Sequence, residues 1–176
     1  MHHLALIIDA PLAVDALFGR QRAMNFLEMV HRQRAALWVP DLWLLEVAML
    51  LQWHLEKQHL SPMEAEQILK ALYRLPNEVL HIDRELALEA AQKVARLECR
   101  TVGDGLYLAL AERFGIPFWT SDVQLYDNVV AYYQREWEKG SPGNPGGPEV
   151  FIRLVDERFD TLPDLGPLGA HPRMRP

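Results

Sequence analysis

Four acidic side chains border or interrupt apolar stretches of this chain, where an unpaired charge is costly to bury. No comparably regular set of lysines or arginines interrupts the same stretches, so internal salt bridges are not the obvious compensation. Carboxylate oxygens suit Mg²⁺ or Mn²⁺ as ligands. We therefore expect the carboxylates to converge within a few ångströms on a divalent cation: Asp9 after residues 4–8, Glu46 within 42–51, Asp104 before 106–110 and Asp122 after 117–121.

Each acid taken alone also has a structural explanation. Asp104 precedes a helical pattern and Asp122 precedes another that begins at Val123, so either carboxylate could cap a helix. Glu46 could be neutralised by a buried salt bridge to an arginine. Asp41 is interpreted as the N-cap of the helix that follows it. If the four acids do cluster, their mutual repulsion predicts a raised pKa for at least one of them.

The chain alternates short apolar runs with longer segments of helical composition. Ser61 and Asp83 are placed to cap two of the predicted helices. Such alternation is typical of a parallel sheet covered by helices on both faces, with ligands at the carboxyl ends of the strands. We expect Asp9 and Asp122 at those ends. The predicted strands are 4–8, 37–39, 79–82, 116–119 and 150–155, and the predicted helices are 20–34, 42–57, 62–75, 84–98 and 105–114.

The length of 176 residues and the content of 49% hydrophobic and 24% charged residues favour a single domain with its own core. From Gly140 onward the chain becomes rich in proline and glycine. We therefore divide it into a domain over 1–139, a loop over 140–149, an edge strand of the same domain over 150–156 and a proline-rich tail over 157–176.

Charge and cysteine content limit the classes of partner and compartment. The net charge of −6 excludes a uniformly basic surface, so a polyanion would need a local group of arginines. The single cysteine, Cys99, excludes an internal disulfide, and no apolar run reaches membrane-spanning length. We expect a cytoplasmic protein. The arginines considered for polyanion contact are Arg20, Arg22, Arg32, Arg34, Arg96 and Arg100.

Four blocks of the sequence, taken together, are similar to a known family. An apolar strand ends in aspartate at Ile7-Ile8-Asp9-Ala10, and a proline-led helix carries Glu46. A third block, residues 104–111, reads Asp-Gly-Leu-Tyr-Leu-Ala-Leu-Ala, and a fourth ends a strand in Thr120-Ser121-Asp122. In order and spacing the chain, over roughly 4–130, resembles the PIN-domain nucleases in the compact form of VapC-type toxins.

The resemblance implies a three-layer α/β fold with a central, mainly parallel sheet of about five strands flanked by helices. It implies metal-dependent endoribonuclease activity with Mg²⁺ or Mn²⁺, a toxin role beside a small antitoxin, and a homodimer. Two departures stand out: Pro11 replaces a serine or threonine frequent in the family, and Val123 replaces a basic or polar residue. The resemblance assigns Asp9, Glu46, Asp104 and Asp122 as the acidic quartet, with Thr120 supporting Asp122 by a hydrogen bond.

Other interpretations of the function remain open from the same sequence features. The departure at Pro11 and the long tail fit a PIN-fold module that binds protein without catalysis, and an RNA-maturation nuclease is a further alternative. Asp127 could add a fifth carboxylate, although a solvated helix face is the better interpretation. For association, we expect helices near 42–75 to form a dimer contact or antitoxin groove through Trp43, Met49, Trp53 and the helix 62–73.

Overall fold

The computed structural model describes residues 5–75, 77–97, 99–139 and 151–155. These residues form five strands that alternate with seven helices. The strands are β1 (Ala5–Ile8), β2 (Ala36–Pro40), β3 (Asn77–Leu80), β4 (Phe118–Thr120) and β5 (Ile152–Leu154). The helices are α1 (Ala10–Leu17), α2 (Gln21–Arg32), α3 (Trp43–Glu56), α4 (Pro62–Leu72), α5 (Arg84–Leu97), α6 (Val102–Phe114) and α7 (Val123–Glu138).

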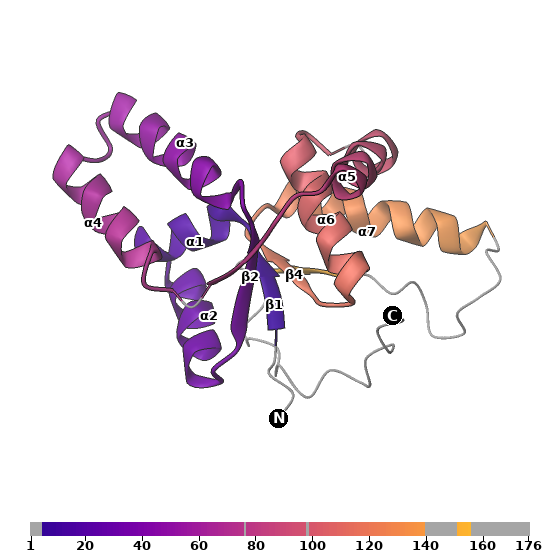
Figure 1. The fold of residues 1–176 in the computed structure, drawn as a ribbon, viewed down its shortest axis with the longest axis horizontal. Coiled ribbons are helices and arrows are strands. Elements are labelled where there is room, and N and C mark those ends of the chain that lie inside the picture. The colour runs from indigo at the N-terminus through magenta and orange to yellow at the C-terminus, as the bar shows by residue number, and fades with distance from the viewer. Residues whose placement is uncertain (1–4, 76, 98, 140–150, 156–176) are drawn as a thin grey trace.

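All the strands are parallel, in the order β3-β2-β1-β4-β5. Helices α1 to α4 lie on one side of the sheet and α5 to α7 on the other (Figure 1). The expected three-layer α/β fold is confirmed. From β1 the chain adds β2 and β3 on one side of this strand, and then β4 and β5 on the other side. The strand order therefore switches between β1 and β4, and ligands of such sheets bind outside the carboxyl ends of the strands at this point.

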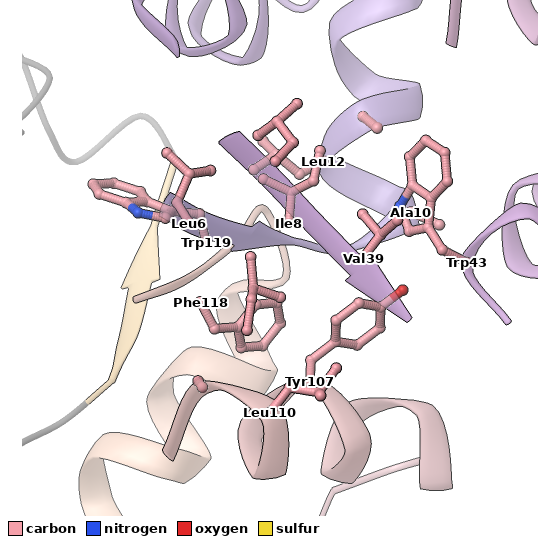
Figure 2. Close-up of a cluster of buried hydrophobic side chains, with 14 of the residues drawn as sticks. Leu6, Ile8, Ala10, Leu12, Val39, Trp43, Tyr107, Leu110, Phe118 and Trp119 are labelled. Carbon is pink, nitrogen blue, oxygen red and sulfur yellow. The ribbon is translucent and has the colours of Figure 1, made fainter. Parts of the chain in front are cut away.

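The core is built on β1, which lies in the middle of the sheet. Leu6, Ile7 and Ile8 are almost completely buried because helices cover both faces of the strand. Phe118 on β4 and Leu110 on α6 pack into the same cluster (Figure 2). The unbroken apolar run before Asp9 therefore positions this aspartate rigidly at the carboxyl edge of the sheet.

Local signals placed several helix ends correctly. Ser61 and Glu64 form a reciprocal capping box at the start of α4, and the Asp83 carboxylate accepts from the backbone N–H of Leu86 at 2.6 Å. The short helix α1 was not predicted, although Pro11 in its first turn is a typical start signal. The Asp41 cap is wrong: its carboxylate pairs with His81 at 2.9 Å, and α3 begins after it without a side-chain cap.

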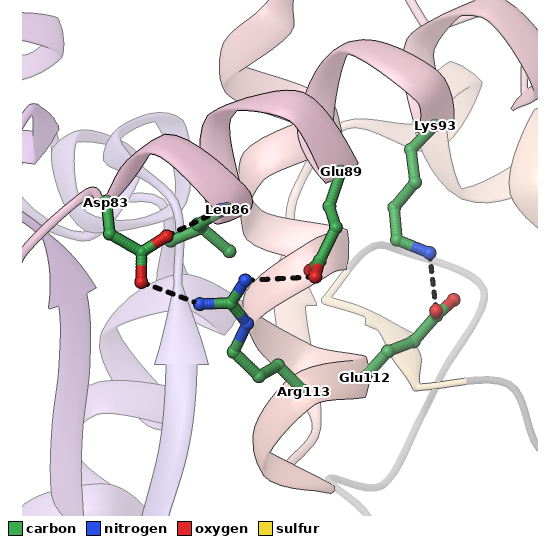
Figure 3. A network of polar contacts seen from close by, with 6 residues as sticks. All are labelled: Asp83, Leu86, Glu89, Lys93, Glu112 and Arg113. Atoms are coloured by element: carbon green, nitrogen blue, oxygen red, sulfur yellow. Dashed lines mark hydrogen bonds and ion pairs between the residues drawn. The ribbon is translucent and has the colours of Figure 1, made fainter.

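Helices α5 and α6 are held together by a close approach and by ion pairs. A Cβ atom on Gly105 would lie 2.3 Å from the carbonyl oxygen of Ala90, so only glycine allows this contact. The guanidinium of Arg113 bridges Asp83 and Glu89, and Lys93 contacts Glu112 (Figure 3). Partly exposed pairs of this kind add little stability each, so we assign the packing at Gly105 the larger part in fixing α6.

Trp43 is 3% exposed and belongs to the core, so the expectation that it supplies an association surface is wrong. Its helix, α3, packs against α1, a helix that the sequence pattern does not predict. Met49 and Trp53 are exposed, as expected, at 61% and 49%.

No helix within the described ranges is long and apolar enough to cross a membrane. Strand β5 lies at the edge of the sheet, as expected, whereas the loop 140–149 and the tail 157–176 lie outside the described residues.

Candidate active site

Asp9 is a buried carboxylate at the junction of β1 and α1. It caps α1 by accepting the backbone N–H of Leu12 at 2.8 Å, and its other oxygen accepts the hydroxyl of Thr120 at 2.5 Å. Its exposed fraction is 4%. Burial raises its pKa to about 7, against the effect of these two hydrogen bonds, and the charges of Glu46 and Asp122 raise it further.

Thr120 connects the ends of the two central strands. Its hydroxyl donates to Asp9 and accepts the backbone N–H of Asp122 at 2.9 Å. The side chain of Asp122 in turn caps α7 by accepting the backbone N–H of Leu125 at 3.0 Å. The expected contact between Thr120 and Asp122 therefore exists, through the main chain of Asp122. The second contact, to Asp9, could not be seen in the sequence because it depends on the pairing of β1 with β4.

Glu46 projects from the first turn of α3 and is held by a residue from the opposite layer. The hydroxyl of Tyr107 on α6 donates a hydrogen bond to its Oε2 atom. Burial raises the pKa of Glu46, the Tyr107 hydrogen bond opposes this, and the charge of Asp104 raises it further. No salt bridge to Glu46 occurs within the described residues, so a paired arginine is not its compensation there.

Asp104 lies inside the first turn of α6, because this helix begins at Val102 and not at Gly105 as expected. It forms a capping box with Thr101: its Oδ2 atom accepts the backbone N–H of Thr101 at 2.9 Å, and the Thr101 hydroxyl accepts the N–H of Asp104. The backbone N–H of Arg100 adds a third contact at 3.1 Å. Capping is thus a real structural role of this residue.

The four acids form a chain of like charges at the carboxyl edge of the sheet. Asp9 is within electrostatic reach of Asp122 and Glu46, and Glu46 is within reach of Asp104. The expectation of a raised pKa holds for Asp9 and Glu46, but burial is its largest cause and mutual repulsion is a smaller one. The site is therefore both acidic and desolvated.

The tight convergence that we expected is not seen. Within the part of the chain that the structure describes, no three acidic, histidine or cysteine side chains are close enough to hold one metal ion. Each carboxylate of the quartet accepts a hydrogen bond from the protein, in a helix cap or from Tyr107.

The quartet nevertheless fits a hard divalent cation in donor type and in charge. All four groups offer carboxylate oxygens, the ligands that Mg²⁺ and Mn²⁺ prefer. No basic side chain pairs with any of the four among the described residues, although Asp9 is almost fully buried. A cation would supply the missing compensation for that charge.

Arg100 and Tyr107 complete the surroundings of the acids. The guanidinium of the exposed Arg100 donates to Gln124, the second residue of α7, so Arg100 spans the elements that carry Asp104 and Asp122. The sequence offered Arg100 only as one of six arginines. It gave Tyr107 no role, since the partner of its hydroxyl lies 61 positions away.

Comparisons with known proteins bear on the family and the fold of the chain. A family model described as "PIN domain" matches residues 6–129. Among solved structures, the crystal structure of PAE2754 from Pyrobaculum aerophilum is similar with a TM-score of 0.54 and 19% sequence identity, over 71% of this chain and 79% of that chain. At this identity the likeness concerns the fold alone. No curated protein matches the chain.

Proposed function

The chain belongs to the PIN domain family, whose members are generally metal-dependent nucleases, and we propose that it is a metal-dependent endoribonuclease. One observation carries the proposal: Asp9 is buried at the carboxyl edge of the sheet, next to further carboxylates and without a basic partner among the described residues. The proposed catalytic residues are Asp9, Glu46, Asp104 and Asp122, supported by Thr120.

In this proposal Asp9, Asp104 and Asp122 hold Mg²⁺ or Mn²⁺, with help from Glu46. When bound there, the cation would lower the pKa of a water molecule and would polarise the scissile phosphodiester. Asp9 is kept in place by the Leu12 amide and the Thr120 hydroxyl, which both favour its ionised form. A nucleophilic side chain is not required, so Cys99 has no part in the chemistry.

Arg100 is the arginine best placed to hold the RNA backbone. It lies between the starts of α6 and α7, beside two of the four acids. In contrast, Arg20 pairs with Asp15 and Arg32 with Glu28. One exposed guanidinium at the edge of an acidic site can donate two parallel hydrogen bonds to two oxygens of a phosphate group and so offset part of the repulsion of the RNA by the carboxylates.

RNA cleavage by the purified protein tests the proposal. We expect cutting of a single-stranded RNA in Mg²⁺ or Mn²⁺, loss of cutting in EDTA, and loss in the Asp9→Asn variant. The matched control is Glu66→Gln on α4, which removes an exposed carboxylate paired with Lys70 and should leave cutting unchanged. Cleavage by Asp9→Asn at the rate of the unchanged protein would contradict the assignment.

We further propose that the enzyme is the toxin of a toxin-antitoxin pair and forms a homodimer. The support is a stripe of apolar side chains on α3, in which Leu45, Met49 and Trp53 recur every four residues and stay exposed. Such a stripe usually marks a protein contact. Expression in bacteria should arrest growth, and the Asp9→Asn variant should relieve the arrest. Cleavage of RNA without growth arrest would favour an RNA-maturation nuclease instead.

The same stripe favours a second candidate function, a module that binds protein without catalysis. In that case the capping and hydrogen-bonding roles of the four acids would be their only roles. Calorimetric titration with Mn²⁺ separates the two. Binding that disappears in Asp9→Asn supports the nuclease, and absence of Mn²⁺ binding together with absence of cleavage supports the binding module.

A further inference from the structure

Tyr107 is a buried residue whose polar atom is directed into the acidic site. Its side chain is 2% exposed, and its ring stacks on Phe118 with centroids 5.2 Å apart and an angle of 12° between the planes. Figure 2 shows the ring beside Phe118, with the hydroxyl directed toward the region of Val39 and Ala10, where β2 ends and α1 begins. The hydroxyl donates to Oε2 of Glu46.

Gly103 leaves room for the other oxygen of the same carboxylate against the backbone of α6. A Cβ atom on Gly103 would lie 2.4 Å from Oε1 of Glu46 and 3.7 Å from its Cδ atom. Glycine inside a helix is unfavourable relative to alanine, so its presence in the first turn of α6 needs a reason. The close approach of the Glu46 carboxylate is such a reason.

Glu46 differs from the other three acids in how its orientation is fixed. Each of the others caps a helix and is held by backbone N–H groups close to it in the chain: Asp9 on α1, Asp104 on α6 and Asp122 on α7. Glu46 has a longer and more flexible side chain and no cap partner. Its position therefore depends on residues of α6, a helix on the opposite side of the sheet.

We propose that Tyr107 and Gly103 are positioning residues that clamp the Glu46 carboxylate between them and aim it at the acidic site. This inference rests on the proposed function. Tyr107 acts through Glu46, because its hydroxyl donates its hydrogen bond to that carboxylate. The clamp joins the first turn of α3 to the first turns of α6, which also carry Asp104, and so ties the position of Glu46 to the helix that holds a second acid of the quartet.

The Tyr107→Phe variant tests the clamp, since it keeps the ring and removes only the hydroxyl. We expect kcat for RNA cleavage to fall at least about tenfold with KM within about twofold, because Glu46 loses its orientation and RNA binding is not touched. The Mn²⁺ dissociation constant, measured by calorimetry without RNA, should rise several-fold. Tyr133→Phe is the matched control, because Tyr133 also donates to a carboxylate, that of Glu112 on the outer side of α6, and should change neither quantity.

Gly103→Ala is the second variant and covers the case in which Tyr107→Phe does not fold. Alanine favours the helix, so a purely structural role of Gly103 predicts equal or higher thermal stability and unchanged cleavage. The clamp predicts unchanged stability with reduced kcat and weaker Mn²⁺ binding, because the new Cβ displaces Glu46.

A double-mutant cycle decides whether Tyr107 acts through Glu46. If it does, Tyr107→Phe should cause no further loss once Glu46→Gln is present. If the fold losses in kcat of the two single variants multiply in the double variant, the clamp is overturned. It is also overturned if Tyr107→Phe cleaves RNA with the kcat and Mn²⁺ affinity of the unchanged protein. If the unchanged protein neither cuts RNA nor binds Mn²⁺, the proposed function fails and the clamp fails with it. If it binds Mn²⁺ without cutting, the Mn²⁺ affinities of the variants decide about the clamp alone.

Discussion

The hydroxyl of Thr120 donates to the carboxylate of Asp9, although the two residues are 111 positions apart in the chain. Ile8 pairs with Trp119 in the neighbouring parallel strands β1 and β4. Asp9 directly follows Ile8 and Thr120 directly follows Trp119, so this pairing brings Asp9 and Thr120 together. Thr120 is fully buried and also accepts the backbone N–H of Asp122. One hydroxyl group thus fixes the relative position of two acids in the proposed site.

Replacing Thr120 with valine should therefore affect both stability and activity. Valine keeps the shape but leaves the Asp122 N–H and one Asp9 oxygen without their partner, which costs about 1–3 kcal/mol in the free energy of unfolding. RNA cleavage should fall as well. Urea denaturation and cleavage assays measure the two effects. Thr120→Ser is the control, since it keeps the hydroxyl; a serine variant as impaired as the valine variant would show that the hydroxyl is not what matters.

The pKa of Asp9 predicts how stability depends on pH. In the unfolded chain this pKa is 3.8, and in the folded protein it is about 7, so the folded state binds the proton more tightly. The free energy of unfolding should therefore fall as the pH rises from about 4 to about 7, and stay low above that. In EDTA, urea denaturation between pH 4 and pH 8 should show a loss on the order of 2–4 kcal/mol over this range.

Asp9→Asn should flatten that profile, because asparagine does not titrate. At pH 8 in EDTA we expect the variant to be about 1–2 kcal/mol more stable than the unchanged protein, since the cost of a buried charge is removed and one hydrogen bond is weakened. Mn²⁺ should stabilise only the unchanged protein. A variant that is less stable at pH 8, or that keeps the original slope, would show that Asp9 is not the group that titrates.

Arg100→Ala should weaken RNA binding. Loss of one phosphate contact is expected to raise Kd about tenfold and to reduce the salt dependence of log Kd by about 0.7 for a single strand. Fluorescence anisotropy in the Asp9→Asn background measures binding to RNA that stays intact. Arg32→Ala is the matched control, because Arg32 is an exposed arginine of α2 paired with Glu28. Equal effects of the two substitutions would indicate only a change in net charge.

The exposed stripe on α3 predicts a dimer that charge can break. Leu45→Glu combined with Met49→Glu places two negative charges on side chains that are 65% and 61% exposed. Light scattering should report a dimer for the unchanged protein and a monomer for the double variant, with unchanged thermal stability of the monomer fold. Leu88→Glu, at a 59% exposed position on α5, is the control and should leave the dimer intact. A monomeric unchanged protein at high micromolar concentration would refute the prediction.

The sequence by itself determined the elements whose signals are local. Continuous apolar runs predicted buried parallel strands, and Ser61 and Asp83 marked helix starts, because a cap joins residues only three positions apart. An acid directly after an apolar strand must lie at the edge of the sheet. The resemblance to the PIN family rests separately on the order and spacing of the motifs that contain Asp9, Glu46, Asp104 and Asp122, and the matching family model confirms the family.

Only the tertiary structure decided what each of these side chains contacts. The neighbours of Asp41 in the sequence predict a helix cap, but Asp41 pairs with His81, 40 positions away, because β2 and β3 end side by side. The sequence pattern predicts an exposed Trp43, but this residue is buried, and its helix packs against the unpredicted α1. The contacts of Thr120 with Asp9 and of Tyr107 with Glu46 depend on strand order and on the packing of layers. Such pairings are set by the burial of the whole core, and a linear pattern of residue types contains no information about them.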